Sequence, residues 1–365
     1  MIRILSLLFI FSFSTCRYAT TAGEYPSPPR GPKNVILMIG DGMGISQITA
    51  GLYSNRNKLN LERCKTVGLI KTYSSDNLIT DSAAGATAFA TGKKTYNGAI
   101  GVGPLKKPLP TILEMAERAS MATGLVATSE ITHATPASFI SHQPSRNQHE
   151  DIALDFLQTE VDLFIGGGRN YFKERTDNRD LTYELTGLQY RILDLNTPFA
   201  QIDLQDYENL AYFTADNAPT RKLKGRNYLP EAGAYAVKTL SQRGAEEGFF
   251  LMIEGSQIDW GGHANNADYI ISEMLDFDET VGKVLDFAQR DGETLVIITA
   301  DHETGGFAIN KGSKMAAGEL KTAFTSGGHT ADLVPVFAFG PGAEAFGGIY
   351  ENTAIFDKMK EALGL

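Results

Sequence analysis

Short apolar runs alternate with stretches of helical periodicity along most of the chain. Val35 to Ile39 is an uninterrupted apolar run that leads directly into Gly40-Asp41-Gly42. A run of this kind is typical of a strand that is buried on both faces of a parallel sheet. The pattern predicts strands within residues 35–39, 125–127, 163–165, 249–253, 295–299 and 336–339, and helices within residues 46–53, 111–119, 149–157, 231–240, 270–289 and 352–362.

This alternation indicates the fold class. Consecutive strand–helix units pair their strands in parallel and place their helices over the two faces of the sheet. We therefore expect an α/β fold with a large, mostly parallel central sheet and helices on both faces. Residues 34–365 are interpreted as one domain. Residues 170–228 show no clear periodicity and carry no motif, so we expect a surface insertion there.

The N-terminal residues have the pattern of a targeting segment. A basic start is followed by an apolar run over residues 4–13, which is too short to span a bilayer as a helix. The pattern predicts a signal peptide over residues 1–22, with Cys16 as a candidate lipid-attachment site; a buried N-terminal strand is the alternative. Four prolines predict an arm over residues 23–33. We expect an exported protein that is periplasmic, extracellular or anchored by lipid to the outer surface.

Composition adds one constraint on the partners of the protein. The net charge is −10, and lysine and arginine are scattered rather than gathered in a basic block. This balance argues against a nucleic-acid partner and against an anionic membrane surface. A site for an anionic substrate must therefore create its own local positive charge. The second cysteine, Cys64, is predicted to be a small core residue.

Side chains of the kinds that bind metal ions follow four of the predicted strands. The carboxyl ends of parallel strands lie at one edge of a sheet, where ligands bind. One aspartate at such a position is commonly a helix cap, but acidic, imidazole and hydroxyl groups after four strands are difficult to explain by capping. The residues are Asp41, His133, Thr135, Glu254, Asp259, Asp301 and His302.

The spacing of the histidines favours metal binding. Asp259 and His263 are four residues apart, which on a helix places them one turn apart on one face, as two ligands of one ion require. Asp301 and His302 are adjacent, and His329 follows two glycines that allow a turn to direct its ring. A single histidine is more often structural than a ligand, but these neighbours favour the ligand interpretation.

Ser82 is the candidate nucleophile. It precedes a run of small residues, Ala83 to Ala88, that is typical of a closely packed helix. A serine at the start of such a helix lies where free backbone N–H groups and the helix dipole favour anions. The alternative is that Asp81 or Ser82 only caps the helix. The nucleophile interpretation is preferred only in combination with the metal-binding residues.

Six motifs together resemble those of bacterial alkaline phosphatases, in the order in which that family has them. They extend over nearly all of residues 34–345. Each motif is weak alone, but six in order are specific. The motifs are Asp41-Gly42-Met43-Gly44, Asp81-Ser82-Ala83-Ala84, His133-Ala134-Thr135-Pro136-Ala137, the run from Glu254 to His263, Asp301-His302-Glu303-Thr304-Gly305-Gly306, and Gly327-Gly328-His329-Thr330.

The resemblance implies three metal sites. It implies that Asp259, His263 and His329 hold one zinc ion. It implies that Asp41, Asp301 and His302 hold a second zinc ion, and that Asp41, Thr135 and Glu254 hold a third ion, which is usually magnesium. Three divalent ions outweigh the four carboxylates involved, so the loaded site is positive inside a chain of net charge −10.

The resemblance also implies residues that contact the substrate. Arg146 matches the arginine that binds the phosphate group of the substrate. His133 and Trp260 stand where the best-known bacterial enzymes have Asp and Lys, and they match a compact branch of the family. We expect both residues to contribute to substrate binding. An imidazole near the third site also makes that site more suitable for zinc than oxygen ligands alone would.

The implied activity is the metal-dependent hydrolysis of a broad range of small phosphate monoesters through a covalent phosphoserine. Two other kinds of protein remain as alternatives: a phosphodiesterase or sulfatase of the same superfamily, and a non-catalytic surface protein that binds phosphate or zinc. Members of the family are usually dimers, but the segment over residues 307–327 is too short for a large dimer-forming insertion. Homodimer and monomer therefore both remain open.

Overall fold

The computed structural model describes residues 31–203, 207–314 and 319–365. The predicted signal peptide, Cys16 and most of the predicted proline-rich arm lie outside these residues. The end of the arm is attached to the domain, because the backbone N–H of Lys33 donates to the carbonyl oxygen of Glu293 over 2.8 Å. Within the described residues, no helix is both long enough and apolar enough to cross a membrane.

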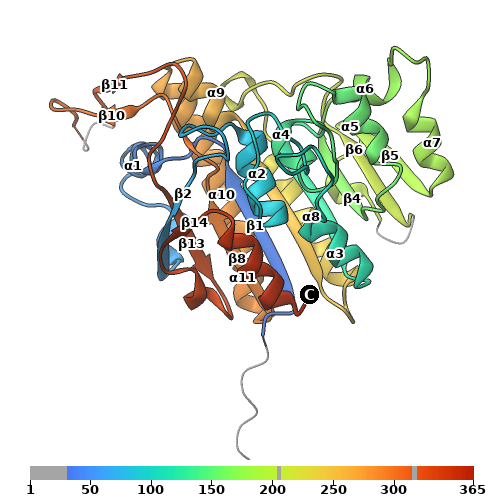
Figure 1. Cartoon of the computed structure of the whole chain (residues 1–365). Helices are drawn as coiled ribbons and strands as arrows, with labels where there is room; N and C mark the ends of the chain where they lie inside the picture. The colour runs from blue at the N-terminus through green and yellow to red at the C-terminus, as the bar shows by residue number, and fades with distance from the viewer. Residues whose placement is uncertain (1–30, 204–206, 315–318) are drawn as a thin grey trace, which may run out of the picture. The chain divides into compact units, whose positions relative to one another are not determined.

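A ten-stranded sheet runs through the domain in the order β14-β2-β13-β8-β1-β7-β3-β4-β6-β5 (Figure 1). Within this sheet, β13 is antiparallel to both of its neighbours, and every other pair of neighbours is parallel. The strands are β1 Asn34–Gly40, β2 Thr66–Lys71, β3 Ala122–Glu130, β4 Leu163–Gly167, β5 Tyr190–Asp194, β6 Asn209–Phe213, β7 Phe249–Gly255, β8 Thr294–Thr299, β13 Val334–Phe339 and β14 Gly348–Glu351.

Helices form a layer on each face of the sheet (Figure 1). On one face, α10 contacts α1, α8 and α9 and packs on β1, β7 and β8; on the other face, α2 contacts α3, α4 and α11. The predicted α/β fold with a mostly parallel sheet is confirmed. The helices are α1 Ile45–Ser54, α2 Ser82–Thr91, α3 Ile112–Arg118, α4 Ala134–Ala137, α5 His149–Asp155, α6 Asn170–Lys173, α7 Leu181–Gly187, α8 Leu229–Arg243, α9 Gln257–His263, α10 Ala267–Asp291 and α11 Ala354–Leu363, with short 3₁₀ turns η1 Asn60–Arg63, η2 Phe199–Gln201, η4 Lys222–Lys224 and η6 Ala343–Phe346.

Two short antiparallel pairs lie outside the central sheet. One pair joins β10, Phe307–Ile309, to β11, Thr322–Phe324. The other pair joins β9, Glu303–Thr304, to β12, His329–Thr330, with His329 opposite Thr304 and Thr330 opposite Glu303. The second pair connects two of the predicted metal-binding segments.

The central strands are apolar because both of their faces are covered. Every residue of β1, β7 and β8 is buried, which accounts for the uninterrupted apolar runs in the sequence. All six predicted strands and all six predicted helices are present. Cys64 is buried in the core, as predicted. The prediction missed β2 and β14, since residues such as Val67 and Ile349 are exposed and their pattern is mixed.

Residues 170–228 contribute more to the fold than the sequence indicated. They include β5 and β6, and β6 pairs in parallel with β4, so this stretch extends the central sheet. Its aromatic side chains also enter the core, where the rings of Phe172 and Phe213 lie 5.1 Å apart. The expectation of a surface insertion is corrected, because this stretch contributes two strands to the central sheet. The sequence did not indicate them, since two short strands separated by a long loop leave no clear periodicity.

Candidate active site

The predicted metal-binding residues meet at the carboxyl edge of the central strands. Asp41 directly follows β1, Glu254 lies at the end of β7, and Asp301 and His302 follow β8. These strands are neighbours and run in the same direction, so their carboxyl ends coincide. The side chains of all four residues are fully buried. Three segments that are far apart in the sequence therefore converge on one buried polar cluster.

Asp41, Asp301 and His302 form the first group. His302 Nε2 lies 3.5 Å from Asp41 Oδ1 and 3.3 Å from Asp301 Oδ2. The backbone N–H of Gly42 donates to Asp301 Oδ1 over 3.2 Å, which orients that carboxylate. The ligand atoms of the three residues lie within 4.8 Å of one another, as atoms that bind one ion must.

Burial and the proximity of like charges shift the pKa values of this group strongly. Burial, reinforced by the charge of Asp301, raises the pKa of Asp41 well above its usual value. Burial and the neighbouring Asp259 raise the pKa of Asp301 to about 6. Burial also lowers the pKa of His302 well below its usual value. A cation that binds between these side chains would relieve the repulsion between the carboxylates.

Asp259, His263 and His329 form the second group. Residues Asp259 and His263 lie one turn apart on α9, as the spacing predicted. Asp259 Oδ1 lies 3.4 Å from His263 Nε2 and 3.5 Å from His329 Nε2, and the two Nε2 atoms are 3.1 Å apart. The neighbouring histidines hold the pKa of Asp259 below its usual range although burial acts in the opposite direction.

The tautomers of this second group fit a bound cation. His263 Nδ1–H donates to the carbonyl oxygen of Gly327, and His329 Nδ1–H donates to that of Thr80, each over 2.8 Å. A carbonyl oxygen only accepts, so each Nδ1 carries a proton, and in the neutral ring each Nε2 carries a lone pair. Two neutral rings whose Nε2 atoms face each other at 3.1 Å repel unless a cation lies between them. This arrangement of backbone partners is typical of metal-binding histidines.

Asp41, His133 and Glu254 form a third group. Buried Nδ1 of His133, Oε1 of Glu254 and both carboxylate oxygens of Asp41 have no hydrogen-bond partner among the described residues, and neither has the hydroxyl of Thr135. Burial raises the pKa of Glu254 to about 7 and lowers that of His133 to about 3. Buried polar atoms without partners are rare in proteins, and a bound cation would give these oxygen and nitrogen atoms a partner.

Ser82 lies beside these groups at the first turn of α2. Its Oγ is 3.3 Å from His302 Nε2. Asp81 caps the helix, since its Oδ1 accepts a hydrogen bond from the backbone N–H of Ala84 over 3.0 Å. Small residues allow this approach: a side chain at Gly85 would place a Cβ 3.0 Å from Asp301 Cβ. Asp81 is therefore the helix cap, and Ser82 lies at the cluster.

Arg146 reaches the same place from the loop before α5. Its guanidinium donates to Asp81 Oδ2 over 3.0 Å, and its Nη2 lies 3.3 Å from His133 Nε2. The side chain is partly exposed, so its remaining N–H groups can reach a ligand. Trp260 meets His133 edge to face, with ring centroids 6.1 Å apart. Helix α9 thus places Trp260 next to the third group and places Asp259 in the second.

Comparisons with known proteins agree with this geometry. The sequence model of the alkaline phosphatase family matches residues 32–323 and 310–365, which together cover nearly all of the described chain. The chain belongs to the alkaline phosphatase family. Its resemblance in sequence to bacterial alkaline phosphatases is therefore confirmed.

Relatives of this family match over most of their length. The structure is similar to that of the alkaline phosphatase from the Antarctic bacterium TAB5, with a TM-score of 0.86 and 47% identity over 92% of this chain and 98% of that one. Alkaline phosphatase 3 of Bacillus subtilis is 34% identical over 91% of this chain and 89% of the relative. Alkaline phosphatase of Escherichia coli K12 is 32% identical over 91% of this chain and 86% of the relative.

Membership of the alkaline phosphatase family decides the reaction. The chain is a hydrolase that acts on phosphate monoesters and binds metal ions. The arrangement of side chains adds two points that the sequence analysis did not contain. His133, which we expected near the third site and at the substrate but not as a ligand, lies in the third metal-binding group. His302 also lies close enough to Asp259 and His329 to join two groups.

Two residues of the phosphatase site were missed because they neither bind metal nor react. Thr304 donates its hydroxyl proton to Asp259 Oδ1 over 2.5 Å and lies 3.2 Å from His302 Nδ1. Since a hydroxyl has one proton, His302 Nδ1–H must donate to it, and His302 Nε2 is left free to bind an ion. Glu303 is also buried, and it accepts hydrogen bonds from the Thr330 hydroxyl on β12 and from the backbone N–H of Phe307 on β10. Their place in the motif after His302 was the only signal.

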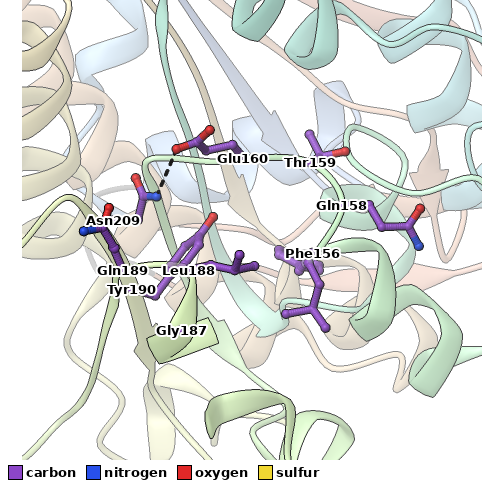
Figure 2. Close-up of a pocket in the computed structure, with 10 residues that line it drawn as sticks. Phe156, Gln158, Thr159, Glu160, Gly187, Leu188, Gln189, Tyr190 and Asn209 are labelled. Carbon is purple, nitrogen blue, oxygen red and sulfur yellow. Dashed lines mark hydrogen bonds between the residues drawn. The ribbon is translucent and has the colours of Figure 1, made fainter. Parts of the chain in front are cut away.

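A separate cavity of about 390 Å³ lies away from the phosphatase site (Figure 2). It is bounded by the turn before β4, the turn before β5 and the start of β6, so it opens at the amino edge of those parallel strands. Asn209 Nδ2 donates to Glu160 Oε1 across part of it over 3.5 Å. None of the predicted site residues lines this cavity.

Proposed function

We propose that the chain hydrolyses phosphate monoesters through a covalent phosphoserine on Ser82. The observation that supports this most directly is the position of Ser82 Oγ, 3.3 Å from His302 Nε2 and at the N-terminus of α2. A nucleophile at that position is next to the buried polar cluster and next to backbone N–H groups that favour a phosphate. Asp81, which caps α2 and pairs with Arg146, holds nucleophile and guanidinium together.

We propose that the three groups hold two zinc ions and a third divalent ion. Asp259, His263 and His329 would hold one zinc, and Asp41, Asp301 and His302 the other. Nitrogen and carboxylate ligands of this kind suit zinc. When bound, the ions lower the pKa of a nearby hydroxyl and stabilise developing negative charge. The unpartnered carboxylate oxygens of Asp41 and Asp301 support this assignment, and so do the Nε2 atoms of His263 and His329, which face each other at 3.1 Å.

The third ion is proposed to be magnesium or zinc. Asp41, Thr135 and Glu254 offer oxygen ligands, which suit magnesium, and His133 adds a nitrogen, which suits zinc. A variant of the TAB5 enzyme in which a histidine is replaced by aspartate has magnesium bound in its M3 site. We expect His133 to make the third site of this chain more selective for zinc than such an aspartate would.

The protein side chains carry the reaction in two displacements. Ser82 Oγ loses its proton to solvent and attacks phosphorus, the bond from phosphorus to the ester oxygen breaks, and the departing alkoxide takes a proton from solvent. A water molecule then loses a proton and attacks the phosphoserine, the bond from phosphorus to Ser82 Oγ breaks, Ser82 Oγ takes up a proton, and inorganic phosphate is released. Phosphoryl transfer depends mainly on positioning and on charge stabilisation. No described side chain is required to recognise the leaving group, so we expect a broad range of monoesters.

Arg146 is proposed to bind the non-bridging oxygens of the phosphate. Its guanidinium offers five N–H donors in a planar fork, and the contacts to Asp81 and His133 leave part of that fork free. Trp260 and His133 would border the substrate on the same side. Because the chain carries net charge −10, the bound ions and Arg146 must supply the local attraction for phosphate.

Location and assembly are proposed on the sequence alone. We propose that residues 1–22 direct export, so that the mature protein is periplasmic, extracellular or attached by lipid at Cys16. We propose a homodimer or a monomer with no nucleic-acid partner. Mass spectrometry of the mature N-terminus in the native host would show whether cleavage occurs and whether Cys16 carries lipid. Light scattering of the purified protein would distinguish the two assembly states.

The phosphoserine is tested by replacing its oxygen. Ser82→Ala should reduce turnover of a monoester at least about a thousandfold and should abolish the phosphoenzyme trapped by acid quenching. Ser141→Ala is a matched control, since Ser141 is buried in the same layer but hydrogen-bonds Asp155 instead. A peptide map of the acid-quenched wild-type enzyme should place the label on the peptide that contains Ser82. A labelled Ser82→Ala protein would contradict the proposal.

A further inference from the structure

We propose that Glu303 is a positioning residue for His329: its buried carboxylate clamps Thr330 and two backbone N–H groups, and this fixes the β9–β12 pair that directs His329 Nε2 toward Asp259 and His263. This inference rests on the proposed function, because it assigns a role toward the zinc ion that those residues would hold. We assign Glu303 no part in the reaction itself, since its carboxylate accepts hydrogen bonds from four protein donors.

Glu303 has a donor for every strong acceptor direction of its carboxylate. Oε1 accepts from Gln47 Nε2 over 2.7 Å and from the backbone N–H of Phe307 over 3.0 Å. Oε2 accepts from the Thr330 hydroxyl over 2.6 Å and from the backbone N–H of Gly306 over 3.1 Å. The residue is only 4% exposed. One carboxylate therefore connects α1, the turn before β10 and the strand that carries His329.

The segment around His329 depends on such hydrogen bonds because little apolar burial holds it. Residues 326–330 are each exposed or half-buried, and two of them are glycines. Gly305 N–H donates to the carbonyl oxygen of Gly328 over 2.9 Å, but Glu303 is the charged anchor. Thr330 directly follows His329 and donates its hydroxyl to Glu303, so we expect loss of this contact to displace the backbone that carries the His329 ring. Outer partners of this kind commonly change metal affinity by about 10- to 100-fold.

Glu303→Gln tests the role of the carboxylate, because it replaces one oxygen by an NH₂ group and leaves the size of the side chain almost unchanged. Each oxygen accepts from one backbone N–H, and a backbone donor cannot reverse its role. Whichever way the amide of the variant turns, its NH₂ group must face the N–H of Gly306 or Phe307. The clamp therefore loses at least one hydrogen bond. Thr330→Val removes only the hydroxyl contact next to His329, and Thr330→Ser restores it.

A matched control exists elsewhere in the domain. Asp278 on α10 is also a buried carboxylate whose two oxygens accept from backbone N–H groups, those of Asn60 over 2.9 Å and Leu61 over 3.1 Å. It anchors η1, away from the metal-binding groups. Asp278→Asn should lower the melting temperature through the same loss of a buried clamp. It should leave zinc affinity unchanged.

The experiment titrates the metal-free proteins with zinc in competition with a chromophoric chelator. We expect Glu303→Gln and Thr330→Val to lower the affinity for one of the bound zinc ions about 10- to 100-fold. The zinc affinities of Thr330→Ser and Asp278→Asn should equal that of the wild type. Wild-type zinc affinity in both Glu303→Gln and Thr330→Val would overturn the inference. An equal loss in Asp278→Asn would also overturn it. A wild-type protein that binds no zinc would instead overturn the proposed metal set.

Discussion

At the scale of single residues, chemistry depends on which atoms are left without partners. Most buried polar atoms in a protein find a hydrogen bond. Here the exceptions among the described residues include both carboxylate oxygens of Asp41, Oδ2 of Asp301 and Oε1 of Glu254. The same side chains have raised pKa values because they are buried close to one another. Unpartnered acceptors and mutual repulsion together define where cations belong.

Arg146 is expected to act on phosphate more than on the leaving group. Arg146→Ala should weaken inhibition by inorganic phosphate about 10- to 100-fold, because charge-assisted hydrogen bonds to two oxygens are lost. Turnover of an activated monoester should fall less, since its leaving group needs little help. Inhibition constants and kcat for an aryl phosphate measure the two effects. Arg146→Lys, which retains the charge without the fork, should lie between; equal losses in both parameters would contradict the assignment.

At the scale of elements, short segments rather than long ones position the site. Helix α2 is built of small buried residues, which lets its N-terminus approach Asp301. Helix α9 has only seven residues and presents Asp259 and His263 one turn apart. Gly262 has no room for a side chain, since a Cβ there would lie 2.8 Å from Thr304 Cβ. Close packing of these short elements therefore brings the metal-binding side chains within reach of one another.

The start of α3 is expected to be stabilised by a protonated histidine. His142 Nε2 donates to Glu114 Oε1 over 2.7 Å, and its Nδ1 donates to the carbonyl oxygen of Gly101 over 2.8 Å. Two acceptors require both ring nitrogens to carry protons. Burial acts against this charge, but Glu114 raises the pKa of His142 above its ordinary value of 6.5. His142 in turn helps to hold the pKa of Glu114 low against its own burial.

The sign of the pH dependence follows. A raised pKa in the folded state means that His142 stabilises the fold fully below its unfolded pKa and loses this effect as pH rises through the folded pKa. His142→Gln should therefore lower the free energy of unfolding by about 1–2 kcal/mol near pH 6 and by less at pH 9. Urea unfolding of both proteins at the two pH values measures this. A difference that grows toward pH 9 would refute the assignment.

At the scale of the whole molecule, metal binding should be part of folding stability. The ions would hold together segments after β1, β7 and β8 with β12, which otherwise meet through repelling carboxylates. A ligand at about 1,000 times its dissociation constant stabilises the folded state by about 4 kcal/mol. Chelation should therefore lower the melting temperature and abolish hydrolysis of monoesters, and zinc should restore both.

Calorimetry with and without chelator, followed by activity assays, measures this dependence. Magnesium alone is expected to restore less activity than zinc, because each of the three groups contains an imidazole. A diester assayed in parallel provides the specificity control. Unchanged melting temperature and full activity after exhaustive chelation would exclude the proposed metal set.

The sequence alone predicted the central strands of the sheet and the edge at which the site lies. Apolar runs marked the buried strands β1, β7 and β8 because both faces of a central strand are covered. The position of Asp41 and Asp301 after such runs then placed them at one edge. Strands at the rim, such as β5 and β14, carried no such signal, since partial exposure mixes polar and apolar residues. Their existence depends on the neighbours with which they pair.

The distances between the residues of the site could not be predicted from the sequence and are determined by the tertiary structure. Sequence spacing relates Asp259 to His263 through one helical turn, but nothing local relates either residue to His329, or Glu303 to Thr330. Those contacts arise because parallel strands bring their carboxyl ends together and because glycines remove the side chains that would hold the segments apart. Residue types therefore specify which chemistry is available, while long-range packing decides which atoms share an ion and which hydroxyl lies beside it.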